Sequence, residues 1–357
     1  MLKNEYRVVG VMSGTSLDGI DLVYASFTKS SGWDFDIVYA ETQPYNKAWL
    51  DVLQHLVGRS KSDLEKINEE YTVYLAGVIQ EFITKHNIKS IDAVCSHGHT
   101  ALHDPENGLT LQIGNLPQLA TLINETVVCD FRVDDVALGG QGAPLVPIGD
   151  ALLFSDYNYC LNLGGFANVS TELYGKRVAF DICPVNIVLN HYVKPLGVSF
   201  DRDGKLAQKG QIQQELLEQL NALEFYGETY PKSLGLEWVM GHVFPLIDTF
   251  NLETADVLRT VVEHVAVQIS KVVPHTKATT MLVTGGGAYN KFLIERIKAL
   301  SGCTVEIPDA NIVEFKEALI FGLLGILRLR GEVNCLMSVT GARKDHSSGY
   351  VYRPKNN

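Results

Sequence analysis

One glycine-rich segment near the start of the sequence has the composition of a phosphate-binding turn. It stands between two apolar runs and reads Gly14-Thr15-Ser16-Leu17-Asp18-Gly19-Ile20-Asp21. A turn flanked by glycines presents its backbone N–H groups without side-chain obstruction, which suits phosphate oxygens. Asp18 and Asp21 could hold a hydrated Mg²⁺ ion through water. No GK[ST] sequence follows, so this is not a Walker loop, and the alternative is a hairpin turn that uses Gly and Asp for backbone reasons.

Two further glycine clusters lie in the second half of the chain. The first contains Gly164 and Gly165, in a turn that mirrors the one near the start. The second follows a predicted strand and precedes a predicted helix, and consists of Gly285, Gly286 and Gly287. Three glycines let a nucleotide lie against the backbone and the N-terminus of the helix. Turns of this kind also occur without any ligand, so the cluster alone does not decide between the two.

Asp181 is a candidate general base, because it ends an apolar strand where a carboxylate is poorly placed for packing. The alternative is an N-cap for the helix predicted from Asn186. His97, His99 and His103 lie within seven residues, but their H-x-H-x3-H spacing is not a zinc signature. We therefore predict no zinc on them, and contacts to sugar hydroxyls or loop packing fit better.

Arg132 follows another predicted strand and offers a fork of N–H donors. Its alternative is a surface ion pair with Asp134 or Asp135. The six cysteines are far apart and form no CxxC pair. This spacing predicts reduced thiols, mostly buried, rather than a disulfide framework or a zinc site.

The composition is that of an ordinary globular protein. Of the 357 residues, 46% are apolar and 20% are charged, which excludes disordered, collagen-like and coiled-coil chains. The net charge of −11, without a basic run, argues against nucleic-acid binding. No apolar run approaches the roughly 20 residues that span a bilayer, and no secretory leader is evident. We expect a cytoplasmic protein without membrane contact, and the sequence leaves a homodimer open.

The elements that must position these residues form a weak repeat. Three strands separated by a turn are predicted near the start and again over 159–182, and each set is followed by alternating helices and strands. This pattern predicts two related α/β halves with a ligand in the cleft that separates them. The glycine- and proline-rich segment Asp134–Pro147 is the best candidate for the crossing from one half to the other. Residues 96–105 are predicted as a loop after a short buried strand.

Taken together, the motifs resemble those of the anhydro-N-acetylmuramic acid kinase family from Arg7 to Tyr352. The resemblance is carried by GVMSGTSLDGID, SHGHT, TLQIG, DFRVDD, GGQGAPLVP, LNLGGFAN, FDICPVN, DRDGKLAQKG, YPKSLGLEW, VTGGGAYN, Glu317-Ala318 and SVTGARKD. It implies two ribonuclease-H-like domains of the actin-like ATPase type, closing on ATP in an interdomain cleft. We place the first domain at residues 1–131 plus about 340–357 and the second at 132–339.

The resemblance also implies an activity. The substrate would be 1,6-anhydro-N-acetylmuramic acid, a sugar of cell-wall recycling, and the cofactors ATP and Mg²⁺. Water would open the 1,6-anhydro ring and O6 would receive the γ-phosphoryl group, giving N-acetylmuramic acid 6-phosphate. Asp181 aligns with the family's catalytic aspartate, the base that deprotonates the water attacking C1.

Other residues match family motifs of known purpose. The resemblance assigns Gly14–Asp21, with Gly164 and Gly165, to ATP binding, and Gly285–Gly287 to the adenosine side. Three residues fall in motifs near the sugar and are assigned to substrate binding: His97, Arg132 and Glu317.

One motif departs from the family pattern. Where the family usually reads DTGPGN, this chain reads DICPVN, so Cys183 and Val185 replace two glycines. If either position requires a positive φ or contact with a phosphate, the replacement would be costly. Two alternatives therefore stay open: a non-catalytic member of the family that senses nucleotide or sugar, and a kinase of a different anhydro-sugar. His99 also stands where the family commonly has Gln, a milder change because both side chains can donate a hydrogen bond.

Overall fold

The computed structural model describes residues 3–355, which form two compact units. Unit 1 contains the described residues up to Leu153 together with those from Phe315 onward, and unit 2 is Phe154–Glu314. Each unit is an α/β structure built on one sheet. None of the helices in residues 3–355 combines the length and the apolar character needed to cross a membrane.

Unit 1 is organised around a seven-stranded sheet with the order β12-β6-β4-β1-β2-β3, in which β5 pairs with β4. Its strands are β1 (Glu5–Ser13), β2 (Ile20–Lys29), β3 (Trp33–Gln43), β4 (Ala93–Asp104), β5 (Leu109–Ile113), β6 (Val127–Cys129) and β12 (Tyr350–Tyr352). Strand β2 runs antiparallel to β1 and β3, whereas β1, β4 and β6 are mutually parallel. Its helices are α1 (Lys47–Leu53), α2 (Lys61–Lys85), α3 (Gln118–Ile123), α4 (Val133–Ala137), α5 (Val146–Leu153), α14 (Met337–Thr340) and the greater part of α13 (Ala310–Arg330).

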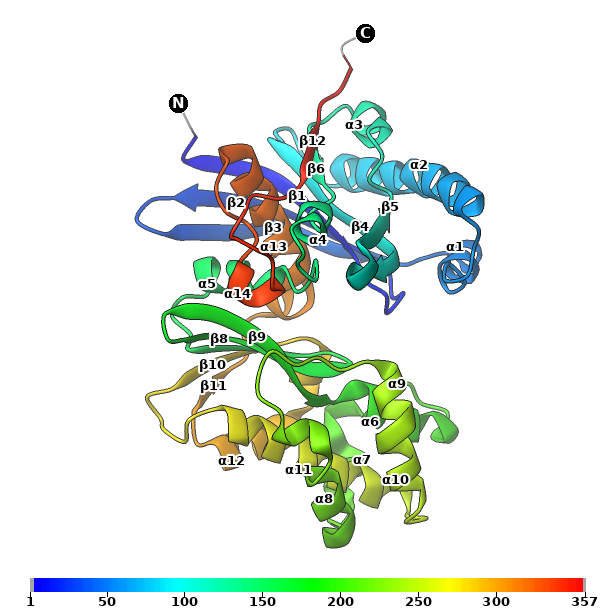
Figure 1. Ribbon diagram of the computed structural model, residues 1–357, viewed down its shortest axis with the longest axis vertical. Helices are drawn as coiled ribbons and strands as arrows, with labels where there is room; N and C mark the ends of the chain where they lie inside the picture. Colours follow the sequence, from blue (N-terminus) through cyan, green and yellow to red (C-terminus); the bar gives the residue numbers. More distant parts are fainter. Residues whose placement is uncertain (1–2, 356–357) are drawn as a thin grey trace. The chain divides into compact units, whose positions relative to one another are not determined.

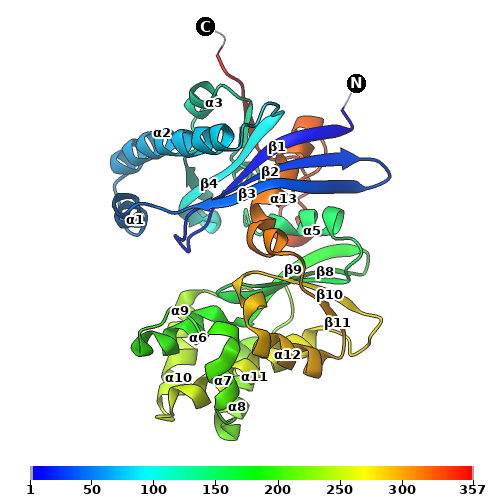
Figure 2. The same ribbon diagram turned by 180° about the vertical axis from the view of Figure 1, so that it is seen from behind.

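Helices cover both faces of the first sheet (Figure 2). On one face, Val9 and Val11 of β1 share a core with Tyr71 and Ile79 of α2. On the other face, β1 approaches α13 closely at Gly10. Alternating side chains of a strand point to opposite faces, so β1 is buried on both sides and its sequence reads as a continuous apolar run.

Unit 2 has a five-stranded sheet with the order β11-β10-β7-β8-β9. Its strands are β7 (Tyr159–Leu163), β8 (Phe166–Leu173), β9 (Lys176–Pro184), β10 (Thr280–Thr284) and β11 (Thr304–Glu306). Its helices are α6 (Asn186–Val193), α7 (Lys205–Lys209), α8 (Gln214–Asn221), α9 (Leu236–Trp238), α10 (Phe244–Asp248), α11 (Thr254–Val272) and α12 (Lys291–Ser301). Helices α6, α11 and α12 share one apolar core with the strands of this sheet.

The two sheets repeat one arrangement, and this confirms the predicted duplication. In each unit the first three strands form an antiparallel meander, and the fourth pairs parallel to the first on its free side. One more strand, β6 in unit 1 and β11 in unit 2, then pairs parallel to the fourth. This strand order is the one expected for an α/β protein with two ribonuclease-H-like halves. The predicted burial of the cysteines is also confirmed, because all six are buried free thiols.

Two features differ from the sequence predictions. Residues 96–104, expected as a loop, continue strand β4, because their backbone pairs with β5. The chain enters unit 2 at Phe154 rather than at 132, and leaves it at Glu314 rather than at about 339. The glycine-rich segment folds back on unit 1, where the N–H of Gln141 donates to the carbonyl of Thr340 over 2.8 Å.

The close approach of β1 and α13 gives a stability prediction. A Cβ atom on Gly10 would lie 2.0 Å from the carbonyl oxygen of Ala318, which is backbone and cannot rotate away. We expect Gly10→Ala to lower the free energy of unfolding of unit 1 by about 3 kcal/mol or more. Gly32→Ala is the control, because no atom lies within 4 Å of its added Cβ, and it should change stability by less than about 0.5 kcal/mol. Denaturant titration of both variants checks this, and equal stabilities would contradict the packing described.

Candidate functional site

The parallel strands of unit 1 bring several predicted site residues to one edge of its sheet. Strand β1 ends at Ser13 and leads into the glycine-rich loop, while β6 ends at Cys129 and leads to Arg132. Strand β4 carries His97 and His99, and its register pairs His99 with Ser13. Because parallel strands end at a common edge, the loop, the histidines and the arginine gather there.

The loop from Gly14 to Asp21 joins the antiparallel strands β1 and β2, so it is also the hairpin connection of the alternative interpretation. Thr15, Ser16 and Asp18 are exposed on it. Leu17 has a φ of 63°, and the N–H of Leu17 donates to the carbonyl of Gly14. Asp21 already belongs to β2 and accepts a hydrogen bond of 2.6 Å from the hydroxyl of Thr42. The exposed hydroxyls of Thr15 and Ser16 are compatible with binding of phosphate oxygens, and the exposed carboxylate of Asp18 is compatible with binding of hydrated Mg²⁺.

His97 and Arg132 are in direct contact. Arg132 Nε donates to Nε2 of His97 over 2.9 Å, and Arg132 Nη1 donates to the carbonyl of Gly142 over 3.2 Å. Since His97 Nε2 accepts, the proton of the neutral ring lies on Nδ1, which donates to the carbonyl of Gly98. Burial, reinforced by the Arg132 charge, lowers the pKa of His97 well below its ordinary value. The guanidinium is thus held by fixed partners, rather than by a surface pair with an aspartate.

Glu317 is the charged partner of this arginine. Its pKa is raised because surrounding protein replaces bulk water, although the charges of Lys316 and Arg132 oppose this effect. Burial in turn lowers the pKa of Arg132 to about 10, and Glu317 acts in the opposite direction. The side chain of Glu317 still contacts solvent. A carboxyl group with a raised pKa beside an oriented guanidinium suits the recognition of a polar ligand.

A buried network of hydroxyls lies beside these residues. Ser13 Oγ is 2.5 Å from the hydroxyl of Tyr45 and 2.7 Å from Nδ1 of His99. The hydroxyl of Tyr45 is also 2.6 Å from that of Tyr71. Burial lowers the pKa of His99 to about 4, so its imidazole is neutral at physiological pH. The network fixes the start of the glycine-rich loop to strand β4.

The sequence analysis missed a second pair at this edge. Asn115 donates over 2.9 Å to Asp130 and over 3.1 Å to the carbonyl of His97. Burial raises the pKa of Asp130 to about 6, and its φ of 58° is unusual for a residue other than glycine. The positions directly after β5 and β6 were the available signal. His103 bonds instead to Thr110, so the three histidines have different partners.

Unit 2 gathers its glycines in the same way. Strand β7 leads to Gly164 and Gly165, and β10 leads to Gly285–Gly287 in a short 3-10 turn. Asn186 begins α6 after β9 and donates through Nδ2 to the carbonyl of Leu163, over 3.1 Å. These contacts bring the ends of β7, β9 and β10 together.

The structure constrains the three glycines after β10 in different ways. Gly285 has a φ of 81°, and a Cβ on Gly287 would lie 2.7 Å from that of Leu163. A Cβ on Gly286 would have no neighbour closer than 3.9 Å. The fold therefore requires Gly285 and Gly287, whereas Gly286 leaves space free.

That space belongs to a cavity of about 490 Å³ in unit 2. Its lining includes Asn186, Leu189, Phe200, Arg202, Gly286 and Tyr289. Phe200 and Tyr289 are 54% and 45% exposed, which is high for aromatic rings beside a cavity. Phe200 and Arg202 were not predicted as site residues, although Arg202 lies in the DRDG motif. The lining combines aromatic and apolar surface with polar side chains, which also include Asp201, Asp203 and Asn290, and such a mixture can bind a small molecule.

Asp181 lies near the end of β9 and is half-buried. Its Oδ2 accepts a hydrogen bond of 2.8 Å from the N–H of Leu234, and its own N–H donates to the carbonyl of Lys232. Burial raises the pKa of Asp181, and the Leu234 hydrogen bond opposes this. Helix α6 has Val185 at its N-cap without a side-chain cap, so the N-cap alternative for Asp181 is not realised. A half-buried carboxylate with a raised pKa is suited to accept a proton.

The structure answers one part of the concern about the DICPVN motif, namely whether either replaced glycine needs a positive φ. Val185 has a φ of −128°, and Cys183 is not among the described residues with positive φ. Both side chains are fully buried in the core of unit 2. The backbone here does not require glycine, and the larger side chains contribute to packing.

Comparisons with known proteins agree with this geometry. The duplicated strand order defines a protein of the actin-like ATPase fold class. The family model for anhydro-N-acetylmuramic acid kinase matches residues 6–354. The chain therefore belongs to the anhydro-N-acetylmuramic acid kinase family.

Individual relatives match over their full length. An anhydro-N-acetylmuramic acid kinase of Sulfurovum sp. (strain NBC37-1) is 34% identical, with 98% of this chain and 99% of that protein covered. One from Pseudomonas savastanoi pv. phaseolicola is 33% identical, with the same coverage of 98% and 99%. Among solved structures, a xylulose kinase from Lactobacillus acidophilus matches with a TM-score of 0.46 at 11% identity, covering 98% of this chain and 94% of that chain. The family assignment depends on the sequence relatives alone.

The neutral His99 gives a pH prediction. Its pKa is about 4 in the folded protein against an ordinary 6.5, so at intermediate pH the unfolded chain binds a proton that the folded one does not. Stability is therefore lost as the pH falls from about 6.5 to 4, by roughly 3 kcal/mol for this group. In His99→Gln this part of the slope should disappear.

Denaturant unfolding between pH 4 and pH 7 measures the slope. The variant His55→Gln removes an exposed imidazole and is the control. If His99→Gln and the wild type lose stability in parallel while His55→Gln does the same, the imidazole of His99 does not titrate as described.

Proposed function

We propose that this chain is an ATP-dependent kinase that opens the 1,6-anhydro ring of 1,6-anhydro-N-acetylmuramic acid and phosphorylates O6. The product is N-acetylmuramic acid 6-phosphate, in the recycling of cell-wall sugars. The single observation that carries the proposal is full-length membership of a family whose members bear the name of this activity. The geometry of each unit supports it as follows.

Unit 2 supplies the nucleotide side. The cavity of about 490 Å³ has the size and lining for an adenosine group. Phe200 and Tyr289 offer ring faces to a base, and the free space at Gly286 lets the ligand approach the backbone. Gly165 extends the glycine-rich surface toward phosphate groups, whereas the N–H of Gly164 already donates to the carbonyl of Phe166 over 3.1 Å.

Unit 1 supplies the phosphate loop and the sugar side. Gly14–Gly19 presents backbone N–H groups and the hydroxyls of Thr15 and Ser16 to phosphate oxygens. Asp18 and Asp21 have the oxygen donors that would hold Mg²⁺ through water. When bound, the ion would neutralise charge on the transferred phosphoryl group.

The sugar-binding assignment rests on three polar groups with fixed orientations. His97 holds the guanidinium of Arg132, whose remaining N–H donors can bind sugar oxygens. Glu317 retains solvent contact and can accept from a hydroxyl. Such groups position a substrate more than they react with it.

Asp181 is the base of the proposed reaction. Its carboxylate takes a proton from the water whose oxygen attacks C1, as the C1–O6 bond breaks. The electron pair of that bond goes to O6, which then attacks the γ-phosphorus, and ADP leaves. The hydrogen bond from Leu234 fixes one carboxylate oxygen, and the other is left for water. The sensor alternative had its only support in Cys183 and Val185, whose positions do not require glycine.

The nucleotide assignment predicts a selective effect at Gly286. Gly286→Val places a branched side chain in free space, so the fold should tolerate it while the nucleotide is obstructed. We expect ATP affinity to fall by roughly 100-fold or more, which is about 3 kcal/mol. Gly241→Val, on an exposed helical segment with no neighbour of its added Cβ, should bind ATP normally. Calorimetry with a non-hydrolysable ATP analogue decides, and normal affinity in folded Gly286→Val would remove this turn from the nucleotide site.

The base assignment predicts the behaviour of Asp181→Asn. The amide keeps the shape but cannot accept the proton of water, so kcat should fall by about 10²–10⁴-fold or more. Affinities for ATP and the sugar should be largely kept. The control is Asp156→Asn, an exposed carboxylate of the same unit, with unchanged kcat. The assay follows the 6-phosphate at saturating Mg-ATP and sugar, alongside a panel of other anhydro-sugars. Wild-type kcat in Asp181→Asn would exclude it as the base, whereas an inert wild type that binds both ligands would favour the sensor.

A further inference from the structure

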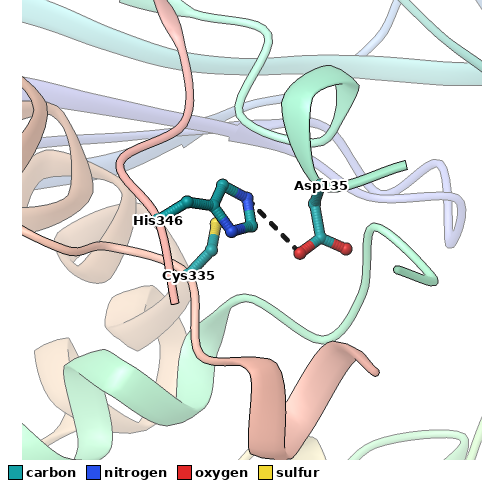
Figure 3. A group of neighbouring side chains, drawn as sticks. All are labelled: Asp135, Cys335 and His346. Carbon is teal, nitrogen blue, oxygen red and sulfur yellow. Dashed lines mark ion pairs between the residues drawn. The ribbon is translucent and has the colours of Figure 1, made fainter. Parts of the chain in front are cut away.

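We propose that Asp135, Cys335 and His346 form a binding site for one Zn²⁺ ion in unit 1. Their ligand atoms lie within 4.8 Å of one another, and all three side chains are buried. Figure 3 shows Asp135 of α4 facing the other two residues, which belong to the C-terminal segment. Within residues 3–355 this is the one group of three Cys, His, Asp or Glu side chains with such spacing. Thiolate, imidazole and carboxylate are the donors that Zn²⁺ takes in proteins.

The backbone fixes two of the three donors as neighbours. Cys335 and His346 form an antiparallel bridge, in which each N–H donates to the carbonyl of the other over 3.1 Å. Residues that exchange hydrogen bonds in this way place their side chains on the same side of the ladder. The sulfur and the imidazole are therefore presented together without any rearrangement of the chain.

The third donor is already oriented. Asp135 Oδ1 accepts from the hydroxyl of Thr340 over 2.7 Å, and Oδ2 accepts from the N–H of Gly142 over 2.7 Å. Partners of this kind fix the direction of a metal-binding carboxylate. The distance from Asp135 Oδ1 to His346 Nε2 is 3.5 Å. Two zinc bonds of about 2.0–2.2 Å at a tetrahedral angle separate their donor atoms by roughly 3.3–3.5 Å, so these two atoms need hardly move.

His346 supplies the observation that points to a cation. Its Nδ1 lies 3.1 Å from the carbonyl of Lys344, which can only accept, so Nδ1 carries the proton. The other ring nitrogen, Nε2, faces Oδ1 of Asp135 at 3.5 Å. Nε2 is buried and makes no hydrogen bond with any described residue, and the whole side chain is 9% exposed. A Zn²⁺ ion held by both atoms would give Nε2 the partner that it lacks, with a water molecule in the fourth position.

Zinc binding at this site requires the thiol of Cys335 to lose its proton, and the released proton can be measured. Burial, together with the charges of Asp135 and Asp134, raises the pKa of Cys335, so the sulfur is protonated when no metal is bound. Zinc binding must displace that proton into solvent. The bound ion would join the C-terminal segment to the loop that ends at Gly142, whose carbonyl accepts from Arg132. The zinc site would thus stabilise the loop whose Gly142 carbonyl holds the guanidinium of Arg132, a proposed sugar-binding residue. It would not take part in the reaction.

Metal content and cobalt spectroscopy test the site independently of kinase activity. The full chain, purified without a tag, is analysed for zinc, then stripped with a chelator and titrated with Co²⁺. The wild type should bind one ion per chain and show a near-ultraviolet thiolate-to-cobalt charge-transfer band, with release of one proton from the thiol. Cys335→Ser should lose the band, and His346→Gln should bind roughly 100-fold more weakly or worse.

A matched control is Cys303→Ser, which removes a buried free thiol of unit 2 and should leave the band unchanged. Circular dichroism verifies folding of each variant, and if Cys335→Ser does not fold, His346→Gln decides. A folded wild type without the band, or a band that survives in Cys335→Ser or His346→Gln at equal affinity, would overturn the proposal. In that case His346 pairs directly with Asp135, which lies at ion-pair distance.

Discussion

Parallel strands end at a common edge of a sheet, and each unit of this chain uses that constraint to gather its polar residues. In unit 1 the edge collects the loop after β1, His97 and His99 on β4, and Arg132 after β6. In unit 2 it collects the turns after β7 and β10 with Asn186 after β9. Residues far apart in the sequence become neighbours because the strand order is fixed. The order itself depends on apolar packing, including the approach of α13 to β1, which leaves no room for a side chain at Gly10.

The groups at these edges are tuned by removal from water more than by opposite charges. Burial is the largest cause of the lowered pKa values of His97 and His99 and of the raised pKa of Asp181. Neutral imidazoles can accept hydrogen bonds, and this lets His97 hold Arg132. A carboxylate of raised pKa is a stronger base for water. Both effects cost stability, and the surrounding hydrogen bonds and apolar cores offset that cost.

Much of this arrangement could be predicted from the sequence, because apolar runs and glycine turns are local signals. The strands β1, β2, β7 and β10, the long helices, the duplication and the role of the strand ends follow from such patterns. The extension of β4 was missed because the polar SHGHT sequence lacks an apolar pattern, although its partner β5 follows directly after residues 105–108. The domain boundaries were missed because the glycine-rich segment is held to unit 1 by the distant Thr340, whose carbonyl accepts from the N–H of Gln141 and whose hydroxyl donates to Asp135. Phe200 carries no local sign of function, and only the assembled fold brings it to the cavity of unit 2.

The central claim is that water attacks the sugar while the phosphoryl group passes unhydrolysed from ATP to O6. Turnover in ¹⁸O-labelled water measures this most directly, with phosphorus NMR and mass spectrometry of the product at short times. Product incubated in labelled water without enzyme corrects for exchange at the anomeric carbon. The account predicts one ¹⁸O atom at C1 and none in the phosphate group of N-acetylmuramic acid 6-phosphate. Label in the phosphate group, or labelled inorganic phosphate formed in place of the sugar phosphate, would contradict it.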